Sequence, residues 1–571
     1  MNKCMDTYSN IEILFENFES LTDSQKRITQ LREFILELAI RGKLGTQNAN
    51  DEPASILLDK VKKEKAQLAQ DSRIRAKPLE PIKKNRVNFC LPPSWVVARL
   101  GEIAQYNAET KIPAANISEN DWVLDLEDIE KDTSRILQKL KFKDRLSLST
   151  KSRFRKGDIL YGKLRPYLNK VVVAEEDGYC TTEIVPIRPF FGIVPKYLMY
   201  SLKSSTFLSY VNSKTYGIKM PRLGTVDAIN AIIPLPPLPE QHRIVEKVDR
   251  LMALCDNLEV QQRTEHEQRI RHGTAALTAL QNAKYSEELE EWWRHIEENF
   301  DPITSSLECV ISLKETIVQL AVLGKLNTQN ITDEPSSAIL DQIKNEFPLN
   351  YKNKPRINDV PKKFSETIPD NWELVSIEYL GEKIVDCPHS TPIFGFGNFA
   401  CVDTNCINDR GIINDKLRYV DYETFNLRNR RLKPQAGDIV LAREATIGTA
   451  VVLPKFPEVC LGQRVMLIRP AKYLDGHFVR LVLSSNVVKQ QYLPKLIGST
   501  VPHLNVGDVV KLIIPLPPLA EQHRIVAKVN TLMALCDKLE AQIREREAAQ
   551  ERFAKATINQ VINAPISTIQ T

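Results

Sequence analysis

The sequence lacks the features of fibrous, secreted and membrane-spanning proteins. Its 571 residues include only 21 glycines, which excludes a collagen-like or Gly/Ser-linker chain. No run approaches the roughly 18 consecutive apolar residues of a membrane span, and the first residues, MNKCMDTYSN, have no signal-peptide pattern. We therefore expect a cytoplasmic protein whose 10 scattered cysteines are reduced thiols.

Signatures of catalysis are scarce as well. Residues 157–163 (GDILYGK) resemble a phosphate loop, but Leu164 stands where such a loop has Ser or Thr. The Asn/Asp-Pro-Pro-aromatic tetrapeptide of base-amino methyltransferases does not occur. Four residues of types that bind metals lie close together in the second half: Cys387, His389, Cys401 and Cys406. Their spacing does not match the paired ligands of structural zinc sites, so we expect no catalytic site, metal or cofactor on this chain.

What the chain has is an internal repeat. Residues 234–259 read PLPPLPEQHRIVEKVDRLMALCDNLE, and residues 515–540 read PLPPLAEQHRIVAKVNTLMALCDKLE, with five differences in 26 positions. A second pair, GKLGTQNANDEP and GKLNTQNITDEP, occupies residues 42–53 and 324–335. The segments between these pairs diverge. Solenoids use short units in at least three copies, so two copies of about 280 residues predict a pseudo-dimer within one chain.

The repeated segments have the apolar pattern of paired long helices. Their apolar residues follow alternating steps of four and three, which is the seam of a coiled coil. We assign to helix pairing and partner docking the residues Ile244, Val248, Leu251, Cys255 and Leu258, with their copies Ile525, Val529, Leu532, Cys536 and Leu539. The divergent segments mix short β-rich runs with helical patterns in a similar order. They predict one mixed fold used twice.

Basic residues concentrate in the first divergent segment. Residues 131–170 contain 13 Lys and Arg and three Asp, a local charge of 13 − 3 = +10, with aromatic residues interleaved. Such a stretch favours nucleic-acid binding, although a solvated charged surface is the alternative. The second divergent segment has a basic cluster at residues 428–433. It also has side-chain types that contact bases, including Gln463 and Arg464.

The twin PLPPLxEQHRIVxKVxxLMALCDxLE segments resemble the specificity subunit of type I restriction–modification enzymes, over essentially the whole chain. The GKLxTQNxxDEP pair resembles the variant with an extra N-terminal repeat region. The resemblance implies an α+β fold: two mixed α/β target-recognition domains separated by two long antiparallel coiled-coil helices, with a pseudo-two-fold internal repeat. It implies two modification (methyltransferase) subunits and restriction (motor–nuclease) subunits as partners. S-adenosylmethionine, ATP and Mg²⁺ would then be used on those other subunits and not on this chain.

The implied function is non-catalytic, sequence-specific recognition of double-stranded DNA. Because the repeated helices match and the divergent segments do not, we expect an asymmetric target of two different half-sites with an unread gap. The alternative is a coiled-coil scaffold with two ligand-binding lobes that do not act on DNA, and salt-dependent duplex binding would separate the two. The expected domains are an N-terminal helical region (1–90), target-recognition domain 1 (91–236), a central helical region (237–362), target-recognition domain 2 (363–517) and a C-terminal helix (518–571).

Candidate DNA-binding residues follow partly from the same resemblance and partly from side-chain type. The loop around GDILYGKLRPYLNK and the segment DCPHSTP lie near DNA in the family, and the second half has AREATIGTA where the first has GKLRPYLNK. The candidates in the first half are Lys163, Arg165, Tyr167, Lys170, Lys219 and Arg222. Those in the second half are His389, Ser390, Thr391, Arg443, Thr446, Arg464, His503 and Asn505.

Overall fold

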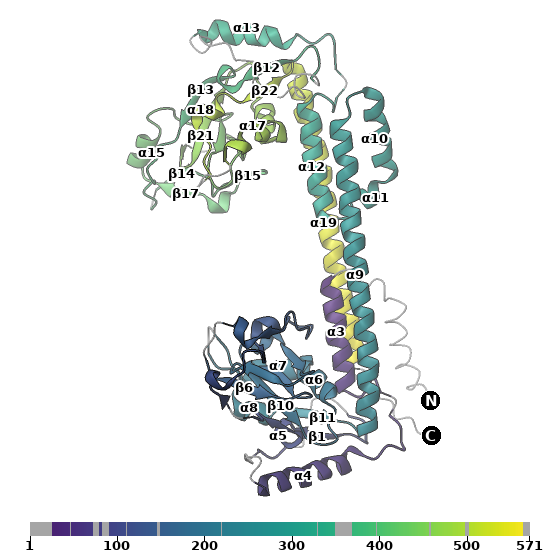
Figure 1. The fold of residues 1–571 in the computed structure, drawn as a ribbon. Coiled ribbons are helices and arrows are strands. Elements are labelled where there is room, and N and C mark those ends of the chain that lie inside the picture. The colour runs from purple at the N-terminus through teal and green to yellow at the C-terminus, as the bar shows by residue number, and fades with distance from the viewer. Residues whose placement is uncertain are drawn as a thin grey trace. The chain divides into compact units, whose positions relative to one another are not determined.

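The computed structural model describes residues 25–563 except 46, 72–78, 83–90, 110, 146–148, 218–219, 328, 349–367, 396, 456–457 and 497–501. Its elements are labelled in Figure 1. The chain divides into two compact units: unit 1 (residues 1–265 and 547–571) and unit 2 (residues 266–546). Two helices of 45 residues, α9 (Leu238–Asn282) and α19 (Leu519–Asn563), contribute residues to both units. Within the described residues, no helix has the length and apolarity needed to cross a bilayer.

Unit 1 contains a mixed domain of two sheets and short helices. A strand pair, β1 (Val96–Arg99) with β11 (Ile232–Leu235), joins the beginning and the end of this domain. One sheet has the order β2-β10-β7-β8, with strands Ala104–Tyr106, Ile184–Pro189, Ile159–Gly162 and Val171–Val173. The other has the order β3-β6-β9-β4-β5, with strands Lys111–Ile112, Lys151–Phe154, Gly178–Thr181, Trp122–Leu124 and Leu140–Lys141. Its helices are α5 (Leu100–Ile103), α6 (Pro195–Lys203), α7 (Ser205–Lys214) and α8 (Thr225–Ile229).

Unit 2 repeats the strand pair and the first sheet. Here β12 (Glu373–Ser376) pairs with β22 (Ile513–Leu516). The sheet β13-β21-β18-β19 has strands Gly381–Asp386, Val465–Pro470, Ile439–Ala442 and Ala450–Val452. The second sheet differs, with the order β17-β14-β20 (Arg418–Val420, Phe399–Val402, Val459–Leu461) and a separate hairpin β15-β16 (Ile407–Asn408, Gly411–Ile412). Its helices are α15 (Tyr422–Arg428), α16 (Gly476–Ser484), α17 (Asn486–Leu496) and α18 (Val506–Val509).

Each unit also has a helical framework. In unit 1, α3 (Gln25–Ile40) lies against α9, with Arg32 Nη2 2.6 Å from Asp256 and 2.7 Å from Glu259. The short helix-flanking segment after α3 meets the start of α9, where Gln47 donates to Glu240 at 3.2 Å. Residue numbers rise along α3 as they fall along α9, so the two helices are antiparallel. A further helix, α4 (Ala54–Gln70), packs on α5 and β1.

The framework of unit 2 is built the same way from α12 (Leu307–Val322) and α19. Lys314 on α12 pairs with Asp537 at 2.6 Å and Glu540 at 2.9 Å. These contacts are equivalent to those of Arg32 with Asp256 and Glu259 in unit 1. The end of α9 runs parallel to α12, since Gln281 donates to Thr316 at 2.7 Å and Gly273 lies against Cys309. Within unit 2, α9 and α19 are therefore antiparallel. Helices α10 (Ser286–Glu298), α11 (Phe300–Ile303) and α13 (Ser336–Glu346) complete the unit.

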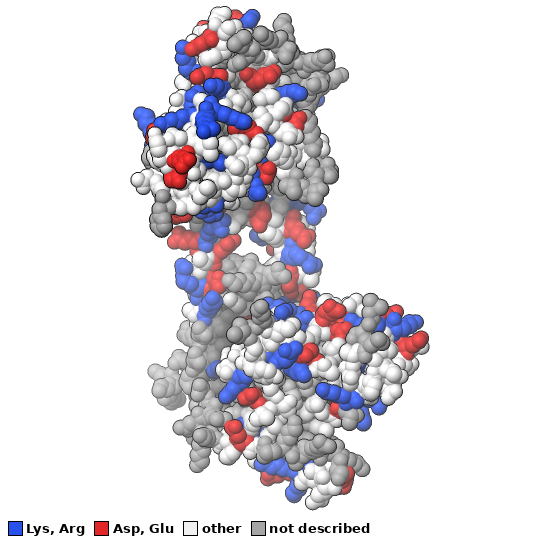
Figure 2. Space-filling model, turned by 90° about the vertical axis from the view of Figure 1, so that its left-hand side faces the viewer, with Lys and Arg blue, Asp and Glu red and all other residues white. Residues whose placement is uncertain are grey.

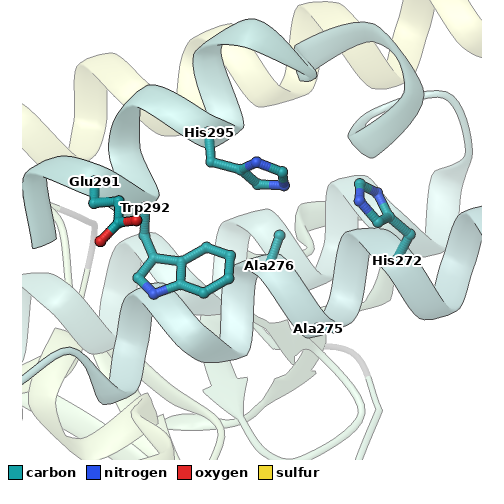
Figure 3. Close-up of a pocket in the computed structure, with 6 residues that line it drawn as sticks. All are labelled: His272, Ala275, Ala276, Glu291, Trp292 and His295. Carbon is teal, nitrogen blue, oxygen red and sulfur yellow. The ribbon is translucent and has the colours of Figure 1, made fainter. Parts of the chain in front are cut away.

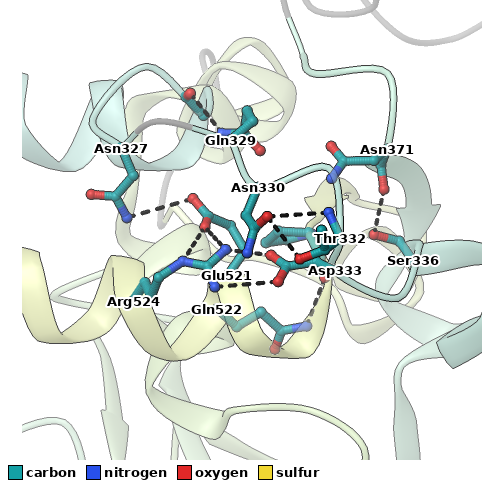
Figure 4. Close-up of polar contacts among 12 residues, drawn as sticks. Asn327, Gln329, Asn330, Thr332, Asp333, Ser336, Asn371, Glu521, Gln522 and Arg524 are labelled. Carbon is teal, nitrogen blue, oxygen red and sulfur yellow. Dashed lines mark hydrogen bonds and ion pairs between the residues drawn. The ribbon is translucent and has the colours of Figure 1, made fainter.

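The second repeated segment docks onto the start of each long helix. In unit 2, Arg524 pairs with Asp333 and with Glu521, and Asn327 donates to Glu521 at 3.5 Å, as Figure 4 shows. In unit 1, Arg243 makes the matching pairs with Asp51 and Glu240. These contacts explain why GKLxTQNxxDEP and the EQHR of the long helix recur together. The predicted α+β fold with mixed domains, long helices and an internal repeat is confirmed.

Candidate nucleic-acid interface

A bidentate ion pair on a buried aspartate holds the strand that leads to each candidate loop. Asp158, at the start of β7, accepts from Arg188 Nε at 2.8 Å and from Nη2 at 2.7 Å. In unit 2, Arg469 and Asp438 form the same bidentate pair, with both distances at 2.8 Å. Pairing with Asp158 raises the pKa of the Arg188 guanidinium. The two loops are thus carried on equivalent strands that are anchored in the same way.

The loop of unit 1 follows β7 and has a fixed backbone. Lys163 N donates to Glu183 O at 3.0 Å, and Leu223 N donates to Lys163 O at 3.1 Å. Arg165 has a positive φ of 49° and donates its amide to Pro221 O at 2.8 Å. Non-glycine residues rarely adopt this left-handed conformation, so the surrounding hydrogen bonds must hold it in place. The loop is a rigid platform for its exposed side chains.

The candidates in unit 1 have different environments. Arg165 and Tyr167 are exposed, and Lys163 is half-buried. Lys170 donates to Leu126 O at 2.7 Å, and Arg222 pairs with Glu183 at 3.1 Å. The two side chains therefore have partners inside the protein, whereas Lys163 and Arg165 have no side-chain partner among the described residues. Lys219 lies outside the described residues.

Part of the basic stretch 131–170 is also used within unit 1. Arg145 pairs with Asp125 at 3.0 Å, and Arg155 pairs with Glu109 at 2.9 Å. Lys151 is buried, and burial lowers its pKa. Figure 2 shows Lys and Arg in blue on the surface of each mixed domain, with Asp and Glu interspersed. The formal charge of the stretch thus overstates the charge that unit 1 presents to a ligand.

In unit 2 the equivalent loop is organised around a buried arginine. Arg443 is only 3% exposed. Its Nε donates to Leu504 O at 2.8 Å, its Nη1 pairs with Asp386, and its Nη2 lies 2.6 Å from His503 Nε2. A guanidinium always donates, so His503 accepts on Nε2. Arg443 is thereby fixed in position and in turn orients His503.

A polar network extends from Arg443 to most of the other candidates. His503 Nδ1 donates to Glu444 at 2.9 Å, and Glu444 also accepts from Arg464 Nε at 2.9 Å. Asp386 binds His389 Nε2 at 3.2 Å. Side-chain exposure is 77% for His389 and 55% for Arg464. The network therefore begins at the buried Arg443 and ends at these exposed side chains.

The DCPHSTP segment joins this network through its neighbours. Thr391 donates to Gln463 Oε1 at 3.2 Å, and Gln463 donates to His389 O. The buried Arg428 binds the same segment from behind, donating to Ser390 O at 2.9 Å and to Pro388 O at 3.1 Å. Sequence analysis placed Arg428 in a basic cluster at residues 428–433 and could not distinguish it from solvated arginines. Its role is to hold the segment.

Three candidates of unit 2 have exposed positions with backbone contacts. Ser390 accepts from Arg428 through its carbonyl, and Thr446 accepts from Thr449 N at 3.0 Å. Asn505 is exposed and precedes α18, and its carbonyl accepts from Asp508 N at 3.0 Å. The side chains of Ser390, Thr446 and Asn505 have no partner among the residues that the structure describes.

The seam residues lie in the helical frameworks. The six most buried are at most 4% exposed: Ile244, Val248, Cys255, Ile525, Val529 and Cys536. The four leucines are partly buried against the same cores: Leu251, Leu258, Leu532 and Leu539. Burial raises the pKa of the Cys255 thiol to about 11, which fits a packing residue and not a reactive one.

The arrangement defines a class of protein in which one mixed domain occurs twice, each copy followed by a long helix, and comparisons with known proteins give the family. The family model of the type I restriction modification DNA specificity domain matches twice, at residues 92–268 and 369–546. The type I restriction enzyme EcoAI specificity subunit of Escherichia coli is 32% identical, over 94% of each chain. The EcoEI specificity subunit of Escherichia coli is 28% identical, also over 94% of each chain. A chain from a solved type I R-M system is 19% identical with a TM-score of 0.49, covering 84% of this chain and 100% of that one. This chain belongs to the type I restriction–modification DNA-specificity family.

Proposed function

We propose that this chain reads an asymmetric, bipartite double-stranded DNA target for a type I restriction–modification complex. Sequence-specific DNA recognition is the function of its family. Residues 91–236 would read one half-site and residues 363–517 the other. The regions 1–90, 237–362 and 518–571 would hold the two readers and dock the other subunits.

One observation carries this proposal: equivalent loops have the same backbone bonds and different side chains. Lys163 and Arg443 each donate their amide to the strand beside them, at 3.0 and 2.8 Å, and each accepts from a leucine amide. The exposed groups differ: unit 1 has Arg165 and Tyr167 in the loop itself, whereas unit 2 has Arg464, before β21, with His503, before α18, beside its loop. Two different half-sites require this combination of a shared backbone arrangement and different exposed side chains.

The chemistry of the side chains at the two loops fits DNA. Cations such as the half-buried Lys163 and the exposed Arg165 can bind phosphates, which positions the duplex, while Arg, Gln and His side chains can reach base edges. In unit 2 the presented groups are already ordered by Arg443 and Arg428, so little side-chain entropy is lost on binding. The chain itself performs no chemistry in this mechanism.

The partners follow from the same proposal. Two modification (methyltransferase) subunits would dock on the helical regions, and restriction (motor–nuclease) subunits would join the complex in the cytoplasm. S-adenosylmethionine, ATP and Mg²⁺ would be bound by those subunits. The isolated chain should then show no methyl transfer and no DNA cleavage.

Methylation mapping tests the proposal directly. Genomic DNA from cells that express the chain with its partner subunits should carry methylation at one motif with two unlike halves. Purified chain or complex should bind a duplex with that motif in a salt-dependent way. A palindromic or continuous motif would reject the asymmetric target. Failure to bind duplex DNA at low salt would reject DNA recognition itself.

A further inference from the structure

A half-open pocket lies in the helical framework of unit 2, away from the candidate loops in the sequence. It has a volume of about 360 Å³ and lies between α9 and α10. Figure 3 shows Trp292 and His295 on α10 and His272 on α9 around the small side chains of Ala275 and Ala276. Because the two alanines fill little space, the aromatic rings line an open recess. Pockets of this size accept a side chain or a small ligand.

The rings of the pocket contact each other edge to face. The Trp292 and His295 ring centroids are 5.5 Å apart at 84°, and those of His272 and His295 are 5.7 Å apart at 64°. Such packing fixes the rings and leaves part of the Trp292 surface in the pocket. The negative face of an indole ring attracts cations, and arginine also stacks on it.

The charge around the pocket selects the sign of its occupant. Helix α10 has six glutamates and one arginine among its 13 residues, and α9 has Arg269 and Arg271 just before His272, so the acidic charge lies on the α10 side. Glu291 itself lines the pocket, is exposed, and has no ion-pair partner among the described residues. The acidic side of the pocket, on α10, favours a cation. Within the described part of the chain, no His, Cys, Asp and Glu residues are grouped so as to bind a metal ion.

We propose that this pocket receives an arginine side chain from the modification subunit. The guanidinium would stack on Trp292 and pair with Glu291, and the neighbouring glutamates of α10 would attract the basic segment that carries it. This inference rests on the proposed function, because it takes the methyltransferase subunit as the partner. It adds a specific docking point, outside the heptad seam, and the chemistry of the group that binds there.

The test measures binding of purified modification subunit to the full-length chain. Trp292→Ala and Glu291→Gln should each weaken this binding by about 10-fold, and Trp292→Phe should restore most of the affinity. Glu267→Gln removes a glutamate from the exposed surface of α9, the other helix of the pocket, and should have no effect. Helix content and duplex binding should be unchanged in all four variants, which establishes that they are folded. Equal affinity of Trp292→Ala and wild type for the modification subunit would overturn the inference.

A photo-crosslinker at Ala275 identifies the occupant. In the assembled complex it should label an arginine-containing peptide of the modification subunit. Labelling of DNA, or of a segment of the modification subunit without arginine, would contradict the proposal. The proposed function fails separately, if the wild-type chain binds neither the modification subunit nor duplex DNA. If the wild type binds both and the pocket variants do too, only the pocket assignment is wrong.

Discussion

The loops that follow β7 in unit 1 and β18 in unit 2 have matching backbone bonds, yet the residue at their base has opposite roles. Lys163 is half-buried, with no side-chain partner among the described residues, whereas Arg443 is buried and binds Asp386, His503 and Leu504. One position is thus available to a ligand in the first half and is used for internal support in the second. Aligned position alone does not identify a DNA contact.

The residue before the neighbouring strand, β10 in unit 1 and β21 in unit 2, also differs between the units. Glu183 and Arg464 accept the equivalent backbone bond, from Lys163 N and Arg443 N. Glu183 pairs with Arg222, whereas in unit 2 the charges are reversed and Arg464 pairs with Glu444. The shared backbone arrangement therefore accommodates side chains of opposite charge at equivalent positions. Two halves with one backbone arrangement can present surfaces of different chemistry, which is what the proposed reading of two different half-sites requires.

The largest effect should come from breaking what the halves share. Val248 and Val529 are equivalent seam residues, exposed by 0% and 3%. Val248→Asp and Val529→Asp each bury an unpaired carboxylate, which should destabilise the affected unit by about 3–5 kcal/mol. Urea unfolding followed by hydrogen exchange measures the loss in each unit. A large loss in one variant and none in the other would show that the two frameworks are not equivalent.

A smaller, one-sided effect should come from the paired loop positions. Arg443→Ala leaves Asp386 without its buried partner and should cost about 3 kcal/mol, with faster amide exchange at residues 386–391. Lys163→Ala removes a half-buried side chain with no partner among the described residues and should change stability by less than about 0.5 kcal/mol, as substitutions away from buried polar networks usually do. Equal destabilisation by the two variants would refute the contrast between the loops.

The first loop should instead respond in DNA binding. Lys163→Ala and Arg165→Ala should each reduce the salt slope of duplex binding by about one if the residue binds a phosphate. A base contact would show differently, as relaxed specificity at one position worth about 1–3 kcal/mol. Titrations at several salt concentrations distinguish the two. Unchanged affinity and specificity in both variants would assign the residues to plain surface.

The smallest effect concerns pH and the Lys314 contacts. Hydrogen bonding to Lys314 lowers the pKa of the Glu540 carboxyl to about 2, against about 4.3 for an ordinary Glu. Because the folded-state pKa is depressed, the pair's contribution is present above about pH 4.3 and is lost as pH falls toward 2. Lys314→Met should raise the pKa of Glu540, which an NMR titration measures. The loss of folding stability at acid pH should then be smaller in the variant than in the wild type. An unchanged pKa of Glu540 in this variant would show that Lys314 does not lower it.

The sequence predicted the framework better than the site. The steps of Ile244, Val248 and Cys255 follow from helix geometry, which is local and periodic, and the structure buries all three. The Arg443–His503 contact joins residues 60 positions apart, and no local pattern encodes such a pairing. The burial of Arg428 was likewise invisible, because a charge run in a sequence does not distinguish buried arginines from solvated ones. The pocket at Trp292 depends on two alanines of another helix.

Duplicating one reader tests the central claim that each mixed domain specifies its own half-site. Residues 363–517 are replaced by a second copy of residues 91–236, and the methylome of cells with this chimera and the partner subunits is sequenced. Identical readers on pseudo-symmetric helices should read a symmetric target, so the motif should become a gapped palindrome that contains the parent's first half-site twice. Retention of the parent's asymmetric motif would contradict the account, and so would a new motif without the first half-site.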